Sequence, residues 1–122
     1  MPIVDVELVA APGDRLAEGL AQSLADVVGR TLQSPAGQTW VRVRVLAREH
    51  YAENASPVPE TDLPVFVTVL KLDLPERAQS ASEIPALTRA VAGILGRAES
   101  CVHVEYAPAA RGRLAFGGKL IE

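Results

Sequence analysis

Residues 2–9 read Pro-Ile-Val-Asp-Val-Glu-Leu-Val, and residues 64–72 read Pro-Val-Phe-Val-Thr-Val-Leu-Lys-Leu. In the first stretch apolar and acidic residues alternate, which predicts a strand from Pro2 to about Ala10 with one buried face. The second stretch is rich in β-branched residues and is typical of a largely buried strand. Both begin with proline, so a similar strand opens each half of the chain.

A helix and a second strand follow the first stretch. Residues 12–14, Pro-Gly-Asp, form a turn that ends in a candidate N-cap, and a helix is expected over about Arg15–Leu32. Its apolar residues recur at intervals of three and four on one face: Leu16, Leu20, Leu24, Val27, Val28 and Leu32. Residues 34–37, Ser-Pro-Ala-Gly, break the helix, and alternating valines and arginines predict a strand over residues 41–48.

The second half repeats this order after an irregular loop over residues 49–63. The strand that opens this half is followed by a helix whose candidate N-caps are Ser80 and Ser82. Its expected apolar face consists of Leu87, Val91, Ile94 and Leu95. Gly96 ends the helix, and the alternating residues of Cys101–Tyr106 predict a fourth strand.

Two tandem β-α-β units of this kind predict an α+β fold. Because crossovers between parallel strands are right-handed, both helices should pack on one face of a single four-stranded sheet. We expect one domain over residues 1–122, made of repeats at about 1–48 and 64–122 that are joined by the loop at 49–63. The other sheet face has no cover within the chain, which favours oligomerisation through a mostly apolar surface.

Composition narrows the class of function. The net charge of −3 is spread without acidic or basic blocks, so neither nucleic acid nor a membrane is expected as a partner. No apolar run is long enough to cross a bilayer and the N-terminus does not resemble a signal peptide, so a cytoplasmic location is expected. Cys101 is the only cysteine, which excludes an intrachain disulfide and a zinc site of several thiolates. No metal or cofactor is expected.

The N-terminal Met-Pro-Ile-Val, the following helix and the Val-Arg-Val strand resemble the tautomerase superfamily. The doubled chain is similar to fused 4-oxalocrotonate tautomerases and to macrophage migration inhibitory factor. The most specific parts are Pro2 and the C-terminal segments 102–104 and 112–118, which look like that family's last strand and glycine-containing hairpin. The resemblance implies a homotrimer with sheets lining the centre, helices outside and the last hairpin reaching a neighbouring subunit.

The resemblance also implies that Pro2 is catalytic, once removal of Met1 makes it the N-terminal amine. A secondary amine must be neutral to act as a base, and burial and nearby cations both lower the pKa of its ammonium form. On the sequence alone, Pro2 could instead be a strand-initiating proline. Pro64 opens the second repeat in the same way, but its nitrogen is locked in a tertiary amide with Leu63, so it is expected to mark a vestigial site.

Three polar residues on strands are candidates for substrate binding: Arg42, His103 and Glu105. Arg42 matches the family's strand arginine, although it could face the vestigial site or be a solvated or interface residue. His103 stands where the 4-oxalocrotonate type has arginine, which weakens the expectation of a dicarboxylate substrate. It shares a strand face with Glu105, and the two residues could line a neighbour's site or stabilise the subunit interface.

The hairpin supplies three more candidates: Arg113, Leu114 and Phe116. Arg113 could restore positive charge at the site or lie in solvent. Leu114 and Phe116 could form apolar walls of the site or pack in the trimer.

These features predict an isomerase of the keto-enol tautomerase type, in which Pro2 is the general base that shifts a proton in a small unsaturated 2-hydroxy or 2-oxo acid. Two alternatives stay open. One is a proline-dependent hydratase, dehalogenase or decarboxylase in which Glu105 activates water. The other is a non-catalytic binding protein of the same fold whose proline is blocked. The intact mass discriminates, because both enzymes require the loss of Met1.

Overall fold

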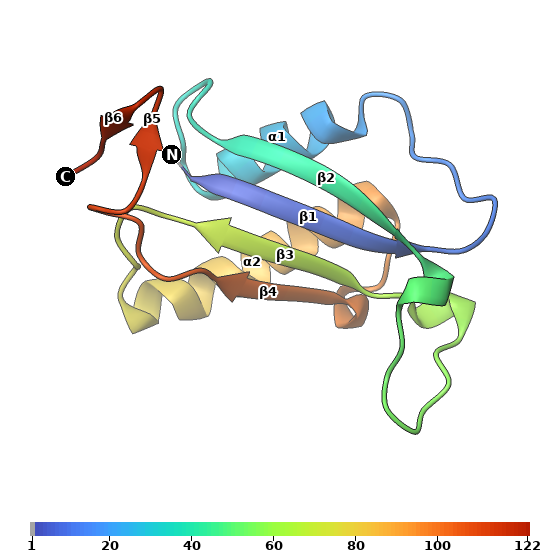
Figure 1. The fold of residues 1–122 in the computed structure, drawn as a ribbon. Coiled ribbons are helices and arrows are strands. Elements are labelled where there is room, and N and C mark those ends of the chain that lie inside the picture. Colours follow the sequence, from blue (N-terminus) through green and yellow to red (C-terminus); the bar gives the residue numbers. More distant parts are fainter. Residues whose placement is uncertain (1) are drawn as a thin grey trace.

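A computed structural model describes residues 2–122 (Figure 1). Its helices and strands, in chain order, are β1 (Ile3–Ala10), α1 (Leu20–Thr31), β2 (Trp40–Ala47), β3 (Val65–Leu70), α2 (Arg77–Leu95), β4 (Val102–Tyr106), β5 (Ala115–Phe116) and β6 (Lys119–Leu120). Short 3₁₀ helices lie at Arg48–His50, Glu60–Asp62 and Glu99–Cys101. The first four strands begin and end within one or two residues of the positions that the sequence patterns predict.

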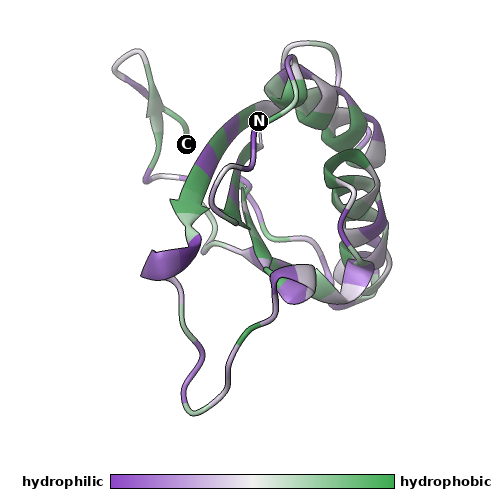
Figure 2. Ribbon diagram, turned by 90° about the vertical axis from the view of Figure 1, so that its right-hand side faces the viewer, coloured by the Kyte–Doolittle hydropathy of each residue, from purple (hydrophilic) through white to green (hydrophobic). Residues whose placement is uncertain are grey.

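The four long strands form one sheet in the order β2-β1-β3-β4. β1 is parallel to β2, β3 is parallel to β4, and the two central strands β1 and β3 are antiparallel. One helix joins each parallel pair, and both helices lie on the same face of the sheet (Figure 2). The expected α+β fold of two β-α-β units is confirmed.

The core lies between the sheet and the two helices. On β1 the even-numbered residues face the helices, and on β3 the odd-numbered residues do so. These aliphatic side chains pack against Leu24 and Val28 of α1 and against Leu87 and Val91 of α2, all of them fully buried. Burial of this apolar surface is the main favourable contribution to folding.

The opposite face of the sheet has no helix over it, as the sequence predicts (Figure 2). It carries seven polar side chains, Asp5, Glu7, Arg42, Arg44, Thr68, His103 and Glu105, and the apolar side chains of Ile3, Trp40, Leu46, Phe66 and Leu70. Asp5 forms ion pairs with both arginines. The mostly apolar surface between subunits stays a prediction, and this face also offers polar groups for pairing with a neighbour.

Helix α1 begins later than predicted, at Leu20. The preceding residue, Gly19, has a φ of 75°, which a helix interior does not allow. Asp14 is not the N-cap that its position suggested. Its carboxylate instead accepts a hydrogen bond from the backbone N–H of Ala11 at 3.0 Å and closes the turn after β1.

Helix α2 begins earlier than predicted, at Arg77, so Ser80 and Ser82 lie inside it and do not cap it. Pro85 is also inside this helix, which therefore lacks one backbone donor. Gly96 ends the helix with a φ of 65°, as the sequence predicts. Neither helix in the described part of the chain is long and apolar enough to span a bilayer.

The expected hairpin follows β4. Its strands β5 and β6 are antiparallel, and the turn between them is Gly117-Gly118, with φ angles of 56° and 87° that favour glycine. Phe116 packs edge-on against Trp40, with 5.0 Å between the ring centres. This contact fixes the hairpin beside the start of β2, on the side of the sheet that the helices leave free (Figure 2).

Candidate functional site

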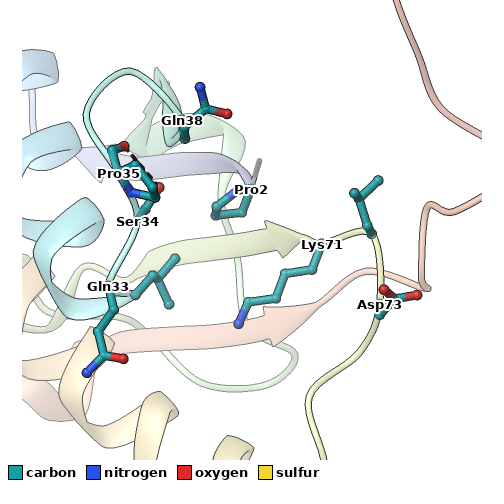
Figure 3. A pocket seen from close by; sticks show the side chains of 9 residues that line it. Pro2, Gln33, Ser34, Pro35, Gln38, Lys71 and Asp73 are labelled. Carbon is teal, nitrogen blue, oxygen red and sulfur yellow. Dashed lines mark hydrogen bonds between the residues drawn. The ribbon is translucent and has the colours of Figure 1, made fainter. Parts of the chain in front are cut away.

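A pocket lies at the end of the sheet where β1 begins and β3 ends (Figure 3). Its volume of about 650 Å³ is sufficient for a small organic acid. The lining residues come from the start of β1, the segment after α1 and the segment after β3: Pro2, Leu32, Gln33, Ser34, Pro35, Gln38, Lys71, Leu72 and Asp73. We call this cavity the Pro2 pocket.

Pro2 is buried and borders the pocket. Its carbonyl accepts a hydrogen bond from the backbone N–H of Trp40 at 3.0 Å, which joins the starts of β1 and β2. Met1 lies outside the described residues, so its removal stays a prediction. The role of Pro2 as an N-terminal amine depends on that removal.

Lys71 comes directly after β3, and its side chain extends below Pro2 in the pocket (Figure 3). Its Nζ donates a hydrogen bond to Oε1 of Glu83, on α2, at 2.6 Å. The hydroxyl of Tyr106, on β4, donates to the same oxygen, and Nζ lies 5.6 Å from the centre of the Tyr106 ring. The Lys71 side chain is 17% exposed and that of Glu83 only 9%. A nearly buried ion pair therefore lies beside Pro2.

The protonation states of this cluster follow from its contacts. Burial by itself would raise the pKa of Glu83, because it disfavours the carboxylate. Hydrogen bonds from Lys71 and Tyr106 and the charge of Lys71 outweigh burial and hold the pKa of Glu83 below its usual range. Burial and the hydrogen bond to Glu83 raise the pKa of Tyr106. At neutral pH Glu83 is a carboxylate and Tyr106 a neutral phenol.

A second charged pair lies at the pocket edge. Arg111 binds Asp73 through two hydrogen bonds, Nε to Oδ1 at 2.8 Å and Nη2 to Oδ2 at 2.5 Å. The hydrogen bond from Arg111 lowers the pKa of Asp73, and it raises the pKa of Arg111 in turn. The negative charge of Asp73 is thus compensated by a residue outside the pocket lining.

Arg42 does not line the Pro2 pocket. It lies on β2 directly opposite Asp5, and its Nε and Nη2 donate to the two carboxylate oxygens of Asp5 at 2.6 and 2.9 Å. The hydrogen bond to Asp5 raises the pKa of the guanidinium. A role for Arg42 in substrate binding stays a prediction, and it would require Arg42 to exchange this partner.

His103 and Glu105 share the uncovered sheet face, as predicted. Glu105 accepts a hydrogen bond from Oγ1 of Thr68 at 3.1 Å, and the His103 ring lies 5.6 Å from that of Phe66. His103 pairs with Phe66 near the start of β3, whereas Pro2 lies beside the end of that strand. Within one chain His103 and Pro2 are at opposite ends of the sheet, so a joint site requires a neighbouring subunit.

The three hairpin candidates differ in their surroundings. The guanidinium of Arg113 donates to the carbonyl of Ala109, with Nε at 3.0 Å. The carbonyl of Leu114 accepts a hydrogen bond from Ile121 at 2.9 Å. Phe116 packs on the ring of Trp40, and the backbone N–H of Trp40 donates to the carbonyl of Pro2, so Phe116 is connected to the Pro2 pocket within the chain.

Comparison with known proteins bears on the fold. No family sequence model and no curated protein sequence matches the chain. The chain does match solved structures. A fused 4-OT protein in a symmetric trimer has 18% identity and a TM-score of 0.75, over 97% of this chain and 94% of that one. Macrophage migration inhibitory factor from Trichinella spiralis has 14% identity and a TM-score of 0.72, over 96% and 97%. FG41 malonate semialdehyde decarboxylase has 19% identity and a TM-score of 0.69, over 94% and 88%.

The chain therefore has the fold that these tautomerase-superfamily structures share. Identities below one fifth show the shared fold alone, and the activity must be argued from this chain's own residues. The tautomerase fold accounts for the two parallel strand pairs, the helices on one sheet face and the C-terminal hairpin.

The cluster of Lys71, Glu83 and Tyr106 was not predicted, although the sequence contains a signal for it. Lys71 continues the odd-numbered, core-facing positions of β3, and Tyr106 continues the even-numbered positions of β4. Glu83 precedes the buried Leu87 by one helical turn. Because buried polar groups are almost always paired, three polar residues in core-facing positions predict a polar cluster.

The opposite sheet end, where β3 begins and β1 ends, is built differently in this tautomerase fold. Pro64 is fully buried, and its carbonyl accepts a hydrogen bond from Val9 at 3.0 Å. Arg97, just after α2, donates to the carbonyls of Leu63 and Val9 at 2.8 and 2.9 Å. The pocket at this end is about 270 Å³, has mainly aliphatic walls and is not lined by Pro64.

The donor groups near Pro2 do not resemble a metal site. Within residues 2–122, no group of three or more His, Cys, Asp or Glu side chains is placed to hold a metal ion. The pocket instead offers an ammonium, amides, a hydroxyl and one carboxylate that is already bound to Arg111. This set suits an organic anion better than a metal cation.

Proposed function

We propose that the chain is an isomerase of the keto-enol tautomerase type. In this proposal Met1 is removed and the Pro2 nitrogen becomes a free secondary amine. The amine takes a proton from the enol hydroxyl of a small unsaturated 2-hydroxy acid, or from the carbon next to the carbonyl of a 2-oxo acid, and gives a proton to another carbon of the same molecule. The observation that carries the proposal is the position of Pro2, buried at the start of β1 and bordering a pocket of about 650 Å³.

The surroundings of Pro2 support its use as a base. Burial disfavours the charged form of an amine, and a nearby cation disfavours it further, so both lower the pKa of the ammonium form toward neutrality. Lys71 shares the pocket and supplies such a cation. The same ammonium group would stabilise the negative charge of an enolate that forms when the proton leaves.

We also propose a homotrimer in which each uncovered sheet face helps to complete a neighbour's site. Two observations support this: His103 and Glu105 lie on that face, and the similar fused 4-OT protein is a symmetric trimer. Light scattering at micromolar concentration tests it, and a monomer would contradict both the trimer and the shared site.

The proposed activity is tested on protein whose intact mass shows the loss of Met1. Ketonisation of phenylenolpyruvate, an aryl enol of a 2-oxo acid, should then be catalysed. The matched control carries a glutamate inserted between Met1 and Pro2, which prevents the release of a free proline amine while leaving the rest of the chain unchanged. Equal activity of the two proteins would show that the base is elsewhere.

A decarboxylase is the second candidate, favoured by the similarity to malonate semialdehyde decarboxylase. In this case Pro2 acts as an acid, and a carboxylate such as Glu105 of a neighbour activates water where water is needed. Release of CO₂ from malonate semialdehyde without ketonisation of phenylenolpyruvate would favour it. Retention of Met1 in the purified protein would instead favour the non-catalytic binding protein.

A further inference from the structure

Lys71 is the one basic side chain that lines the Pro2 pocket within residues 2–122. Two other basic candidates have partners elsewhere: Arg42 binds Asp5, and Arg113 binds the carbonyl of Ala109. The antiparallel register of β1 and β3, extended by one residue beyond Ile3 and Leu70, places Lys71 directly opposite Pro2. An anion that enters the pocket therefore meets Lys71 beside the proline.

The ammonium group of Lys71 is held in a fixed position. Oε1 of Glu83 accepts its hydrogen bond at 2.6 Å, and Tyr106 donates to the same oxygen. Fixing a free lysine side chain on ligand binding would cost up to about 2 kcal/mol of side-chain entropy, and here much of that ordering is already present. An ammonium has three N–H donors, and among the described residues Glu83 takes one, which leaves donors for a ligand.

The charges of the pocket suit one negative group and not two. Lys71 and Asp73 are the charged residues of the lining, and Arg111 already binds Asp73. A carboxylate in direct contact with Lys71 gains a charge-assisted hydrogen bond. Glu83 behind Lys71 weakens its field at longer range, so a second carboxylate in the pocket would lose its hydration without another cation of the same chain in the lining.

We propose that Lys71 binds the carboxylate of a monocarboxylic 2-oxo acid in the Pro2 pocket, with Glu83 and Tyr106 as positioning residues that hold its ammonium group. This inference rests on the proposed function and names its substrate class. The acid carries a single carboxylate, bound at Lys71, with its reactive carbons beside Pro2.

The kinetic test compares phenylenolpyruvate with its methyl ester, which has the same reacting carbons but no carboxylate. Lys71→Met should raise KM for the acid about tenfold, a loss of about 1.4 kcal/mol of binding, with a smaller change in kcat. KM for the ester should stay within twofold. Arg89→Met, which removes an exposed cation from α2, is the control and should change neither value. An equal effect on acid and ester, or none on the acid, would overturn the proposal.

Lys71→Met leaves the Glu83 carboxylate buried without its partner, and the variant could fold poorly for that reason. The double variant Lys71→Met, Glu83→Met removes both charges and avoids this problem. It should fold and show the same selective rise in KM for the acid. Wild-type KM for the acid in the folded double variant would contradict the role of Lys71.

A binding measurement separates this inference from the proposed function. The chain has two lysines, Lys71 and Lys119, so ¹⁵Nζ labelling of lysine gives two assignable ammonium signals. Phenylpyruvate should shift the Lys71 signal saturably and leave that of Lys119 in place, and the methyl ester should shift neither. A Lys71 signal that does not respond to the acid overturns the inference. A Pro2→Ala variant with full activity overturns the proposed function and leaves this binding result standing.

Discussion

At the Pro2 end and at the Pro64 end of the sheet, a strand led by proline begins beside the end of an antiparallel neighbour and the C-terminal part of a helix. The same register places Lys71 opposite Pro2 and Val9 opposite Pro64. The cavity is about 650 Å³ at the first end and about 270 Å³ at the second. The backbone is therefore arranged similarly at the two ends, but the side chains and the cavity sizes differ.

The difference lies in how each end uses its cation. At the Pro64 end, Arg97 donates to the carbonyls of Leu63 and Val9 and holds the strand ends together. At the Pro2 end, Glu83 on the neighbouring helix holds the Lys71 ammonium in the pocket wall. Both cations border a cavity, but Arg97 directs its donors to two backbone carbonyls that hold the strand ends, whereas Lys71 binds one carboxylate oxygen and keeps donors for a ligand.

The largest expected effect separates the two prolines. Pro2→Ala should lower kcat/KM for ketonisation by about 10²- to 10³-fold, because it replaces the secondary amine that we propose as the general base. Pro64→Ala, its matched control, should leave kcat/KM per folded trimer within twofold, since the Pro64 nitrogen is in a peptide bond. Steady-state kinetics on variants of checked oligomeric state measure both. Loss of activity in both variants to the same degree would remove the distinction between the two ends.

Glu83→Gln should lower the free energy of unfolding by about 3 kcal/mol at pH 7, because it leaves the Lys71 ammonium nearly buried without a counter-charge. The folded-state pKa of Glu83 is lowered, so the stability it contributes is present above the unfolded pKa, about 4.3, and is lost as the pH falls through the folded value. The difference between wild type and variant should therefore shrink below about pH 4. Urea unfolding at matched protein concentration measures it.

The control for this prediction is the same substitution in an exposed ion pair. Glu60 lies 3.3 Å from Arg48, and its side chain is 66% exposed. Glu60→Gln should change the unfolding free energy by less than about 1 kcal/mol, as is usual for surface pairs. Equal losses of unfolding free energy in Glu60→Gln and Glu83→Gln would show that burial does not strengthen the contribution of the Lys71–Glu83 ion pair.

The four long strands could be predicted because each depends on a local pattern. Alternation of apolar and polar residues marked β1, β2 and β4, and a run of β-branched residues marked β3. The hairpin was expected from the family resemblance, and the Gly117-Gly118 pair forms its turn. The helix starts could not be placed as well, because a positive φ at Gly19 and the tolerance of α2 for Pro85 outweighed the capping signals.

The Pro2 pocket was predictable only in part. Pro2 itself was found through the family resemblance. The cluster of Lys71, Glu83 and Tyr106 joins a strand end, a helix and another strand, and its assembly depends on sheet register and helix facing that no local pattern specifies. The uncovered face was predictable from the right-handed crossovers, and the alternation of the strands shows which polar residues it carries.

A smaller effect is expected at the Pro64 end. Arg97→Met should lower the unfolding free energy by about 2 kcal/mol, because the carbonyls of Leu63 and Val9 lose their shared donor in a partly buried place. Activity per folded trimer should not change, since Arg97 does not line the Pro2 pocket. Chemical unfolding and steady-state kinetics on the same samples measure both, with the exposed Arg89→Met as control. Loss of activity in Arg97→Met without loss of stability would instead show that Arg97 contributes to catalysis at the Pro2 pocket.

The smallest expected effect concerns His103, which lies near the Pro64 end of its own chain. If it serves a neighbour's Pro2, His103→Ala should lower kcat/KM about tenfold, a loss of about 1.4 kcal/mol of transition-state binding. The melting temperature should change little, because His103 is exposed and makes few packing contacts within the chain. Weaker assembly with unchanged turnover per intact trimer would instead assign His103 to the interface.

Mixed trimers decide whether His103 and Pro2 act across subunits. Chains with His103→Ala keep Pro2, and chains with Pro2→Ala keep His103, so a site between two such chains can combine both intact residues. Unfolding and refolding an equal mixture should therefore give several times the mean activity of the two separate variants. A site built within one chain cannot be restored in this way, because no chain in the mixture contains both residues. Activity equal to the mean would place the function of His103 within its own subunit and would leave the Pro2 pocket to the groups that its own chain supplies.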